Sequence, residues 1–304
     1  MDSKYFIENY PDYLFKYVAN GAPSEDTKYN YKLAINQYMK WCEKHNINIL
    51  KAKESDVLNY RSHLLNLGMK ATSINAKLTC VKRFYYVAIK YEVCNKDPAS
   101  GINAPRNPEA NLTLVKYLTQ EQLIKLLRSF DESQEDDFRT KCIVMLMGIE
   151  GLRTIEVHRL NVEDIDFNLE TILIRGKGHN DFVYPTKRTL KYLRSYINSR
   201  RAIKNGRQTP VFTSMSNNNT YGRITRCAIR NSIDKALEKC GFKSETVSCH
   251  MLRHTCATLL YRETLDLQVV KNVLRHKSIE MSSRYAHIQD AMLRRYTNAI
   301  AIDD

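Results

Sequence analysis

A stretch without apolar periodicity divides this chain into two parts. Residues 101–110 contain two prolines and no recurring apolar spacing, and they follow a run of helical patterns. Proline lacks a backbone N–H and restricts the residue before it, so such a stretch is typical of an interdomain linker. The 304 residues also exceed the length of one common domain, about 150 residues. We therefore predict two domains, residues 1–103 and 117–304, joined by a linker at 104–116.

The first domain carries three helix patterns. A capping cluster at residues 24–26 precedes a helix that extends to about residue 46, and further helices are expected over residues 54–67 and 72–91. One face of the third helix is marked by apolar residues at helical spacing, namely Ile74, Leu78, Val81, Tyr85 and Ile89. We therefore expect a small helical domain.

The chain is strongly basic, with a formal net charge of +14. A charge of this sign attracts polyanions, and we expect nucleic acid as the partner. Lys77, Lys82 and Arg83 on the third helix either contact DNA phosphates or form a solvated basic face, and the pattern leaves both interpretations open. No apolar run approaches the ~20 residues that cross a bilayer, and the first residues do not resemble a signal peptide. We therefore expect a cytoplasmic protein without a membrane partner.

The second domain is predicted to be mainly α-helical with a small β-sheet. Residues 119–122 form a capping box before a helix, and residues 141–149 have the composition of a buried helix. Residues 166–175 and 181–185 carry alternating or β-branched apolar residues, with a Gly-Lys-Gly turn around Lys177 between them. This pattern predicts a β-hairpin with Lys177 in its turn. The residues after the hairpin are expected to be helical.

Four separated segments of this domain carry side chains suited to phosphate chemistry. They are Gly151-Leu152-Arg153, the Lys177 turn, His250-Met251-Leu252-Arg253-His254, and Leu274-Arg275-His276 followed by Tyr285. Taken singly, each is more often structural, because arginines and lysines are usually solvated and a tyrosine is usually packed. Guanidinium groups donate two parallel hydrogen bonds to phosphate oxygens, which suits Arg153 and Arg253. His250, three residues before Arg253, lies on the same side of a helix start and can act as a general acid or base.

Together these segments resemble the signature of the tyrosine recombinase, or phage integrase, family, and in particular that of Xer-like site-specific recombinases. The matching strings are GLRTIEV, GKG, HMLRHTCAT and LRHKSIEMSSRYAH, and the resemblance spans about residues 119–287. The first domain resembles the SAM-like core-binding domain of that family in DTKYNYKLAINQYMKWC and SINAKLTCVKRFYYVAIK. The resemblance implies a C-shaped clamp around DNA, formed by a helical core-binding domain and a catalytic domain.

The resemblance assigns a role to each candidate side chain. Arg153 and Arg253 would clamp the scissile phosphate, and each donor aimed at the transition state is worth about 3 kcal/mol by analogy with an oxyanion hole. His250 would accept or share the proton of the tyrosine. Lys177 would protonate the leaving 5′ oxygen, and His276 would support the phosphate or the tyrosine by hydrogen bonding.

Tyr285 would be the nucleophile and form a 3′-phosphotyrosine bond. This bond stores the energy of the phosphodiester, so rejoining needs neither ATP nor water. No metal or other cofactor is expected, because two arginines, a lysine and two histidines supply the positive charge. The eight cysteines show no zinc-ligand spacing and are expected to be reduced thiols. Glu156 and Asp164 are expected either to lie on a helix surface or to support the site, without binding metal, and His254 is expected to support the site.

Four positions depart from the family pattern. Arg275 stands where glycine usually precedes the histidine, and Thr264 replaces another common glycine. Cys249 stands where proline is common, and Lys177 is followed by Gly178 instead of by another basic residue. None of these changes removes a catalytic group, but the last leaves DNA contact by the hairpin open.

The family resemblance also implies an assembly on DNA. Two protomers would bind inverted half-sites, and four would exchange strands through a Holliday junction, with or without an accessory directionality factor. Residues 291–302 have the composition of a short amphipathic helix, with Met292, Leu293, Tyr296 and Ile300 as its apolar residues. This helix either docks on a neighbouring protomer or packs on its own domain, and both alternatives stay open.

Three activities compete for this sequence. The first is a site-specific recombinase, the second a type IB topoisomerase-like enzyme that relaxes DNA, and the third a DNA-binding protein without catalysis. The complete catalytic set argues against the third, because scattered lysines alone provide phosphate affinity. The compact helical first domain and the tail argue against the second. We therefore expect a recombinase, whose target site and task, whether integration and excision of a mobile element, chromosome-dimer resolution or inversion, stay open.

Overall fold

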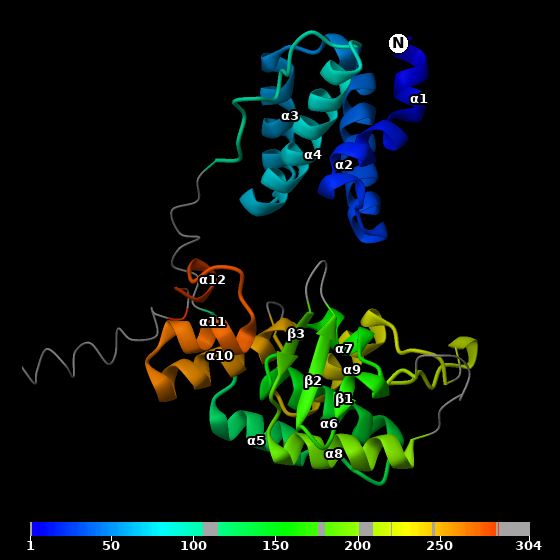
Figure 1. Ribbon diagram of the computed structural model, residues 1–304. Coiled ribbons are helices and arrows are strands. Elements are labelled where there is room, and N and C mark those ends of the chain that lie inside the picture. Colours follow the sequence, from blue (N-terminus) through cyan, green and yellow to red (C-terminus); the bar gives the residue numbers. More distant parts are fainter. Residues whose placement is uncertain are drawn as a thin grey trace, which may run out of the picture. The chain divides into compact units, whose positions relative to one another are not determined.

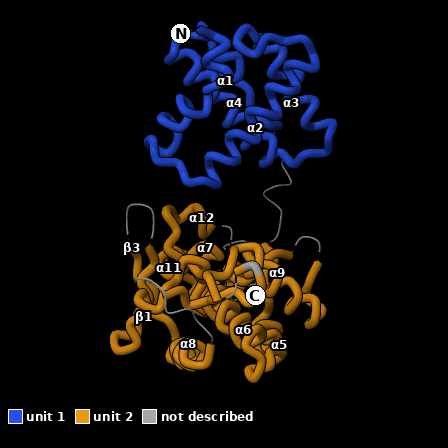
Figure 2. Tube along the Cα trace, turned by 90° about the vertical axis from the view of Figure 1, so that its right-hand side faces the viewer, with its two compact units in different colours: residues 1–113 blue, residues 114–304 orange. Residues whose placement is uncertain are grey.

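A computed structural model of the chain describes residues 2–105, 115–175, 180–200, 209–219, 221–244, 247–283 and 285. The chain forms two compact units, Met1–Thr113 and Leu114–Asp304, drawn in blue and orange in Figure 2. Each unit has its own apolar core. In the part of the chain that the structure describes, no helix is long and apolar enough to cross a membrane.

The first unit is helical, as predicted. Its helices are α1 (Ser3–Leu14), α2 (Glu25–Lys44), α3 (Glu54–Asn66) and α4 (Ala71–Lys90), linked in part by the short 3-10 turns η1 (Phe15–Tyr17), η2 (Ala19–Gly21) and η3 (Ile49–Lys51) (Figure 1). The three predicted helices correspond to α2, α3 and α4. Helix α1 was not predicted, although Phe6, Tyr10 and Leu14 recur at four-residue spacing and are buried.

The buried face of α4 holds the first unit together. Ile74, Leu78, Val81 and Tyr85 are fully buried, whereas Ile89, predicted for the same face, is 36% exposed. The hydroxyl of Tyr85 lies 2.9 Å from that of Tyr38 on α2 and donates to a backbone carbonyl at 2.8 Å. A buried hydroxyl without a partner would cost free energy, so these hydrogen bonds offset the cost of burying Tyr38 and Tyr85.

The second unit is mainly helical around a small sheet, also as predicted. Its helices are α5 (Gln120–Arg128), α6 (Glu135–Gly148), α7 (Thr154–Arg159), α8 (Lys187–Ser199), α9 (Arg226–Lys239), α10 (His250–Thr264), α11 (Leu267–Leu274) and α12 (Glu280–Ser283), with the 3-10 turns η5 (Val162–Asp164) and η6 (Asn217–Asn219). Helix α6 is the central one: it contacts α5, α7, α8, α9 and α10. It begins earlier than predicted, with three acidic residues in its first turn, where negative charge is favourable.

The predicted hairpin is present in an antiparallel sheet of order β1-β2-β3. The strands are β1 (Ile165–Asp166), β2 (Thr171–Arg175) and β3 (Asn180–Val183), and Arg175 pairs with Asn180 at the end of the hairpin next to the connection between the two strands. The guanidinium of Arg175 forms an ion pair of 2.6 Å with Asp164, whose side chain is buried. Asp164 therefore anchors the strand that leads into the turn.

A glycine brings the site elements together. Gly151, between α6 and α7, has φ +70°, and a Cβ atom there would lie 2.5 Å from Cδ2 of Leu274 and 3.1 Å from Sγ of Cys256. Only glycine combines this left-handed conformation with so close an approach. The turn before Arg153 consequently lies directly against α10 and α11, which Figure 1 shows side by side.

We expect Gly151→Ala to lower the free energy of unfolding by about 2–5 kcal/mol, because left-handed strain and overpacking add. Gly241 is the matched control: its φ is +76°, but nothing lies within 4 Å of the position of a Cβ atom. Gly241→Ala should therefore cost only the strain, about 1–2 kcal/mol. Urea unfolding followed by circular dichroism measures both, and equal losses would contradict the close packing at Gly151.

Candidate active site

Arg153 is fixed from one side by Glu156. It is the N-cap residue of α7, and its backbone N–H donates to Oε2 of Glu156 at 2.8 Å. Its Nη1 also forms an ion pair of 2.8 Å with Oε1 of the same carboxylate. The Arg153 side chain remains 31% exposed, so its guanidinium is oriented by the protein and still accessible from solvent.

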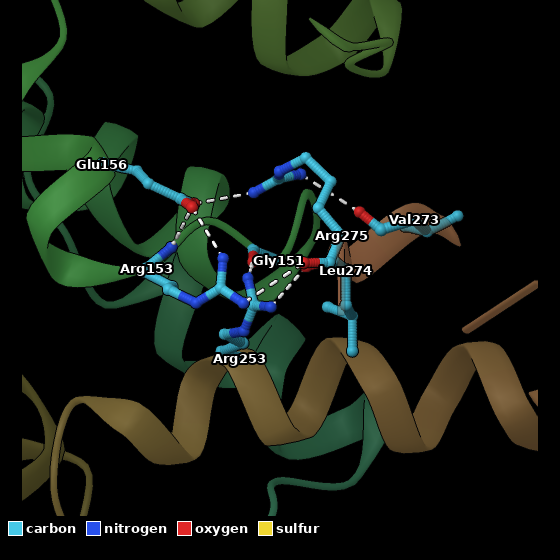
Figure 3. Close-up of polar contacts among 7 residues, drawn as sticks. All are labelled: Gly151, Arg153, Glu156, Arg253, Val273, Leu274 and Arg275. Atoms are coloured by element: carbon cyan, nitrogen blue, oxygen red, sulfur yellow. Dashed lines mark hydrogen bonds and ion pairs between the residues drawn. The ribbon is translucent and has the colours of Figure 1, made fainter. Parts of the chain in front are cut away.

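Arg253 is buried and held by backbone carbonyls. It lies in the first turn of α10 and is 3% exposed. Its Nη1 donates to the carbonyl of Gly151, and its Nη2 to the carbonyl of Leu274 (Figure 3). Burial, and next the charge of Arg153, lower the pKa of Arg253 to about 10, so the guanidinium stays protonated at neutral pH. Among the described residues it forms no ion pair, which leaves its positive charge to attract an anion.

The turn that ends α11 joins both arginines. Arg153 Nη2 donates to the carbonyl of Arg275 at 3.4 Å, next to the Leu274 carbonyl that accepts from Arg253. The side chain of Arg275 returns to Glu156, with 2.7 Å between Nη2 and Oε2 (Figure 3). Burial by itself would raise the pKa of the Glu156 carboxyl, but the Arg275 charge and the contacts with Arg153 together lower it. Glu156 is therefore a carboxylate at neutral pH.

Tyr285 is buried against a histidine. Its hydroxyl shares a hydrogen bond of 2.8 Å with Nδ1 of His254, and the residue is 1% exposed. The ring of His254 in turn packs against that of His250, with centroids 5.2 Å apart and planes at 89°. The sequence assigned the tyrosine proton to His250 and gave His254 only a supporting part. His254 is thus a residue whose direct contact with Tyr285 sequence reasoning missed.

His276 lies between Arg275 and the tyrosine segment. Its backbone N–H donates to the carbonyl of Lys271 at 2.9 Å, and its Nδ1 lies 2.7 Å from Oγ of Ser282. Ser282 is fully buried, and its carbonyl accepts from the backbone N–H of Tyr285 at 3.0 Å. Ser282 therefore links the His276 ring to the backbone that carries the tyrosine.

Lys177 lies outside the described residues, as does the tail, residues 291–302. The hairpin that carries Lys177 is described on both sides of it, at Arg175 and at Asn180. The role of Lys177 therefore stays a prediction.

The candidate DNA contacts of the first unit already have partners within that unit. Lys77 and Lys82 donate to side-chain amide oxygens, Lys82 at 2.9 Å, and the Arg83 guanidinium lies 5.2 Å from the ring centre of Tyr86. These contacts are compatible with a structural role and with DNA contact alike, so both interpretations stay open.

The arrangement suits transfer of a phosphoryl group to a tyrosine. Two guanidinium groups donate to carbonyls of one turn, at residues 274 and 275. A tyrosine hydroxyl is hydrogen-bonded to the imidazole of His254, on the helix that carries Arg253. Such donors stabilise a pentacoordinate phosphorus, and a histidine on this helix can take up the proton of the tyrosine. Among the described residues, no group of three or more histidine, cysteine or carboxylate side chains is arranged to hold a metal ion.

Comparisons with known proteins match both units. The Phage integrase family profile matches residues 116–292, and the profile of the Phage integrase, N-terminal SAM-like domain, matches residues 7–92. The chain is 27% identical to "Tyrosine recombinase XerD" of Pasteurella multocida, over 89% of this chain and 90% of that protein. It is 30% identical to "Tyrosine recombinase XerC" of Chlamydia caviae, over 75% of this chain and 72% of that protein.

Two solved structures share the fold. One is the XerH site-specific recombinase bound to its palindromic difH substrate in a post-cleavage complex, with a TM-score of 0.73, 20% identity, and coverage of 89% of this chain and 78% of that chain. The other is a lambda integrase (75-356) dimer bound to a COC' core site, with a TM-score of 0.66, 14% identity, and coverage of 90% and 96%. At these identities the similarity shows the fold alone.

Proposed function

This chain belongs to the phage integrase family, and we propose that it is a tyrosine site-specific recombinase that cuts and rejoins double-stranded DNA through Tyr285. The observation that carries the proposal is that Arg153 and Arg253 both donate to carbonyls of residues 274–275. The Tyr285 hydroxyl is hydrogen-bonded to His254, on the same helix as Arg253. The curated relatives are tyrosine recombinases, and they match across both units. This argues for recombination over simple DNA relaxation and over binding without catalysis.

The two arginines would hold the scissile phosphate. Arg253 would donate to the phosphate from a buried position, and Arg153 from a partly exposed one. Negative charge on the nonbridging oxygens grows in the transition state, and one well-aimed donor is worth about 3 kcal/mol there. Loss of either guanidinium should therefore slow cleavage by about 10²-fold.

Tyr285 would attack the phosphorus as its hydroxyl gives up a proton. His254 orients the hydroxyl, and His250 takes or shares the proton as the sequence resemblance implies. The bond from phosphorus to the 5′ oxygen breaks, Lys177 protonates that oxygen, and His276 supports the bound phosphate. The product is a 3′-phosphotyrosine, and attack by the 5′ hydroxyl of another strand reverses every step.

The first test is covalent capture. A nicked suicide substrate carrying a candidate site, incubated with EDTA, should yield a protein–DNA band with the wild-type chain and none with Tyr285→Phe. EDTA should not reduce the band, because the proposed charge comes from side chains. Tyr196→Phe is the matched control, since Tyr196 is a fully buried tyrosine of the same unit, and it should keep the band. A band that persists with Tyr285→Phe would refute the nucleophile.

The second test concerns Lys177 as the general acid. Lys177→Ala should slow cleavage by about 10²–10⁴-fold, the usual contribution of such a group. A substrate with sulfur at the leaving 5′ position should restore the rate, because a thiolate leaves without a proton. The exposed Lys191, substituted in the same way, serves as the control and should cleave both substrates normally. An equal loss on both substrates would contradict the role of Lys177.

We also propose assembly of four protomers on DNA through the tail. We assign residues 1–103 to DNA binding, 104–116 to a linker and 117–304 to catalysis and assembly, with inverted half-sites bound by pairs of protomers. A groove of about 640 Å³ with a mixed apolar and charged lining supports this. Its lining comes from α5, α10 and α11 and includes Leu123, Ile124, Leu127, Leu259, Leu260 and Val273. The proposed occupant is the tail of a second copy, which supplies Met292, Leu293, Tyr296 and Ile300.

The third test removes the tail. A chain that ends at residue 290 should bind a single half-site with unchanged affinity but lose cooperative binding to two half-sites and lose strand exchange. Gel-shift titration measures both. Ile124→Glu, which changes a 39% exposed side chain of the groove and leaves the tail intact, should reproduce the loss, because a carboxylate buried without a partner opposes docking. Intact cooperativity in both variants would refute docking between protomers.

A further inference from the structure

A third arginine, Arg275, lies beside Arg153 and Glu156, although the proposed chemistry does not use it. The Arg275 side chain is 7% exposed and forms an ion pair of 2.7 Å with Glu156. Its Nη1 donates to the carbonyl of Val273 at 3.1 Å, and its Nε is buried without a hydrogen-bond partner among the described residues. Burying an incompletely satisfied guanidinium costs free energy, so its presence calls for a compensating role.

The backbone at Arg275 carries a second cost. The residue ends α11 with φ 54° and ψ 50°, in the left-handed region. Residues with a Cβ atom are disfavoured in this conformation, whereas glycine adopts it readily. Backbone strain of this kind concentrates at functional sites, and here the side chain of the strained residue lies beside a candidate catalytic group.

Glu156 connects Arg275 to Arg153. Its Oε1 pairs with the Arg153 guanidinium, and its Oε2 accepts from the Arg153 backbone N–H and pairs with Arg275. A carboxylate paired with Arg153 alone would offset the charge that has to bind a phosphate. With Arg275 present, two guanidinium groups share one carboxylate, and the three side chains keep one net positive charge.

We propose that Arg275 is a positioning residue that offsets the charge of Glu156, so that Glu156 orients Arg153 without weakening its hold on the scissile phosphate. The inference rests on the proposed role of Arg153. The turn of residues 274–275 thus has two roles. Its carbonyls hold Arg153 and Arg253 in place, and the Arg275 side chain offsets the negative charge beside Arg153.

The test is single-turnover cleavage of the nicked substrate by the full chain at saturating enzyme. Arg275→Gln and Arg275→Gly should each slow cleavage about tenfold, within the range of coupled neighbouring residues. Arg275→Lys, which keeps the charge, should stay within about threefold of wild type. In a Glu156→Gln background, Arg275→Gln should change the rate less than about twofold, because no carboxylate remains to be offset.

Two controls separate positioning from folding. Arg275→Gly relieves the left-handed strain, so its thermal midpoint and its affinity for DNA should stay near wild type while the cleavage rate falls. Arg128→Gln removes the same charge from an exposed position on α5 and should leave the rate unchanged.

The outcomes are distinct. Cleavage by Arg275→Gln at the wild-type rate would overturn the inference and leave the proposed function standing. A tenfold loss that persists in the Glu156→Gln background would contradict the inference that Arg275 acts by offsetting the charge of Glu156. No covalent product from the wild-type chain would overturn the proposed function itself, and the inference with it.

Discussion

The burial of Arg253 is the constraint on which the rest of the site depends. Its guanidinium is satisfied by two carbonyls, Gly151 from the turn after α6 and Leu274 from the end of α11. A buried cation that lost either acceptor would be strongly destabilised, so the two segments are tied to α10 together. The carbonyl partners neutralise no charge, and the cation stays available to an anion. This one arrangement therefore both stabilises the second unit locally and supplies the electrostatic field of the proposed chemistry.

The fold followed from the sequence wherever apolar periodicity was strong. Helices α2, α3 and α4 and the hairpin were predicted from spacing and turn residues, since each has one buried face. The start of α6 was placed too late, because residues 138–148 are buried on all sides and show no periodic face. Helix α1 was missed since Pro11 interrupts a pattern that its buried residues complete. Strand β1 spans two residues, too few for any pattern.

The candidate site was predictable as a set of residue types and not as a set of contacts. The family resemblance proposed Arg153, Arg253, His276 and Tyr285 as site residues, but it could not tell which histidine touches the tyrosine. His250 and His254 are one helical turn apart on the same face, and the choice between them depends on where the segment after α12 places Tyr285. Likewise, the pairing of Arg275 with Glu156 spans 119 residues. The close approach of the Gly151 turn to Leu274 brings these two charges together, and no local pattern in the sequence shows it.

The arginines and the tyrosine depend on cores of different size. Arg153 and Arg253 each follow a residue of the main core of the second unit, Leu152 and Leu252. Tyr285 belongs to a much smaller cluster formed with residues of α10 and α11, among them Tyr261 and Val270. Among the described residues this cluster has fewer buried members than the main core, and fewer buried contacts make local opening less costly. The proposed nucleophile would exchange its hydrogen bond with His254 for one with a phosphate, and its place in the smaller cluster makes that movement less costly than a movement of the main core.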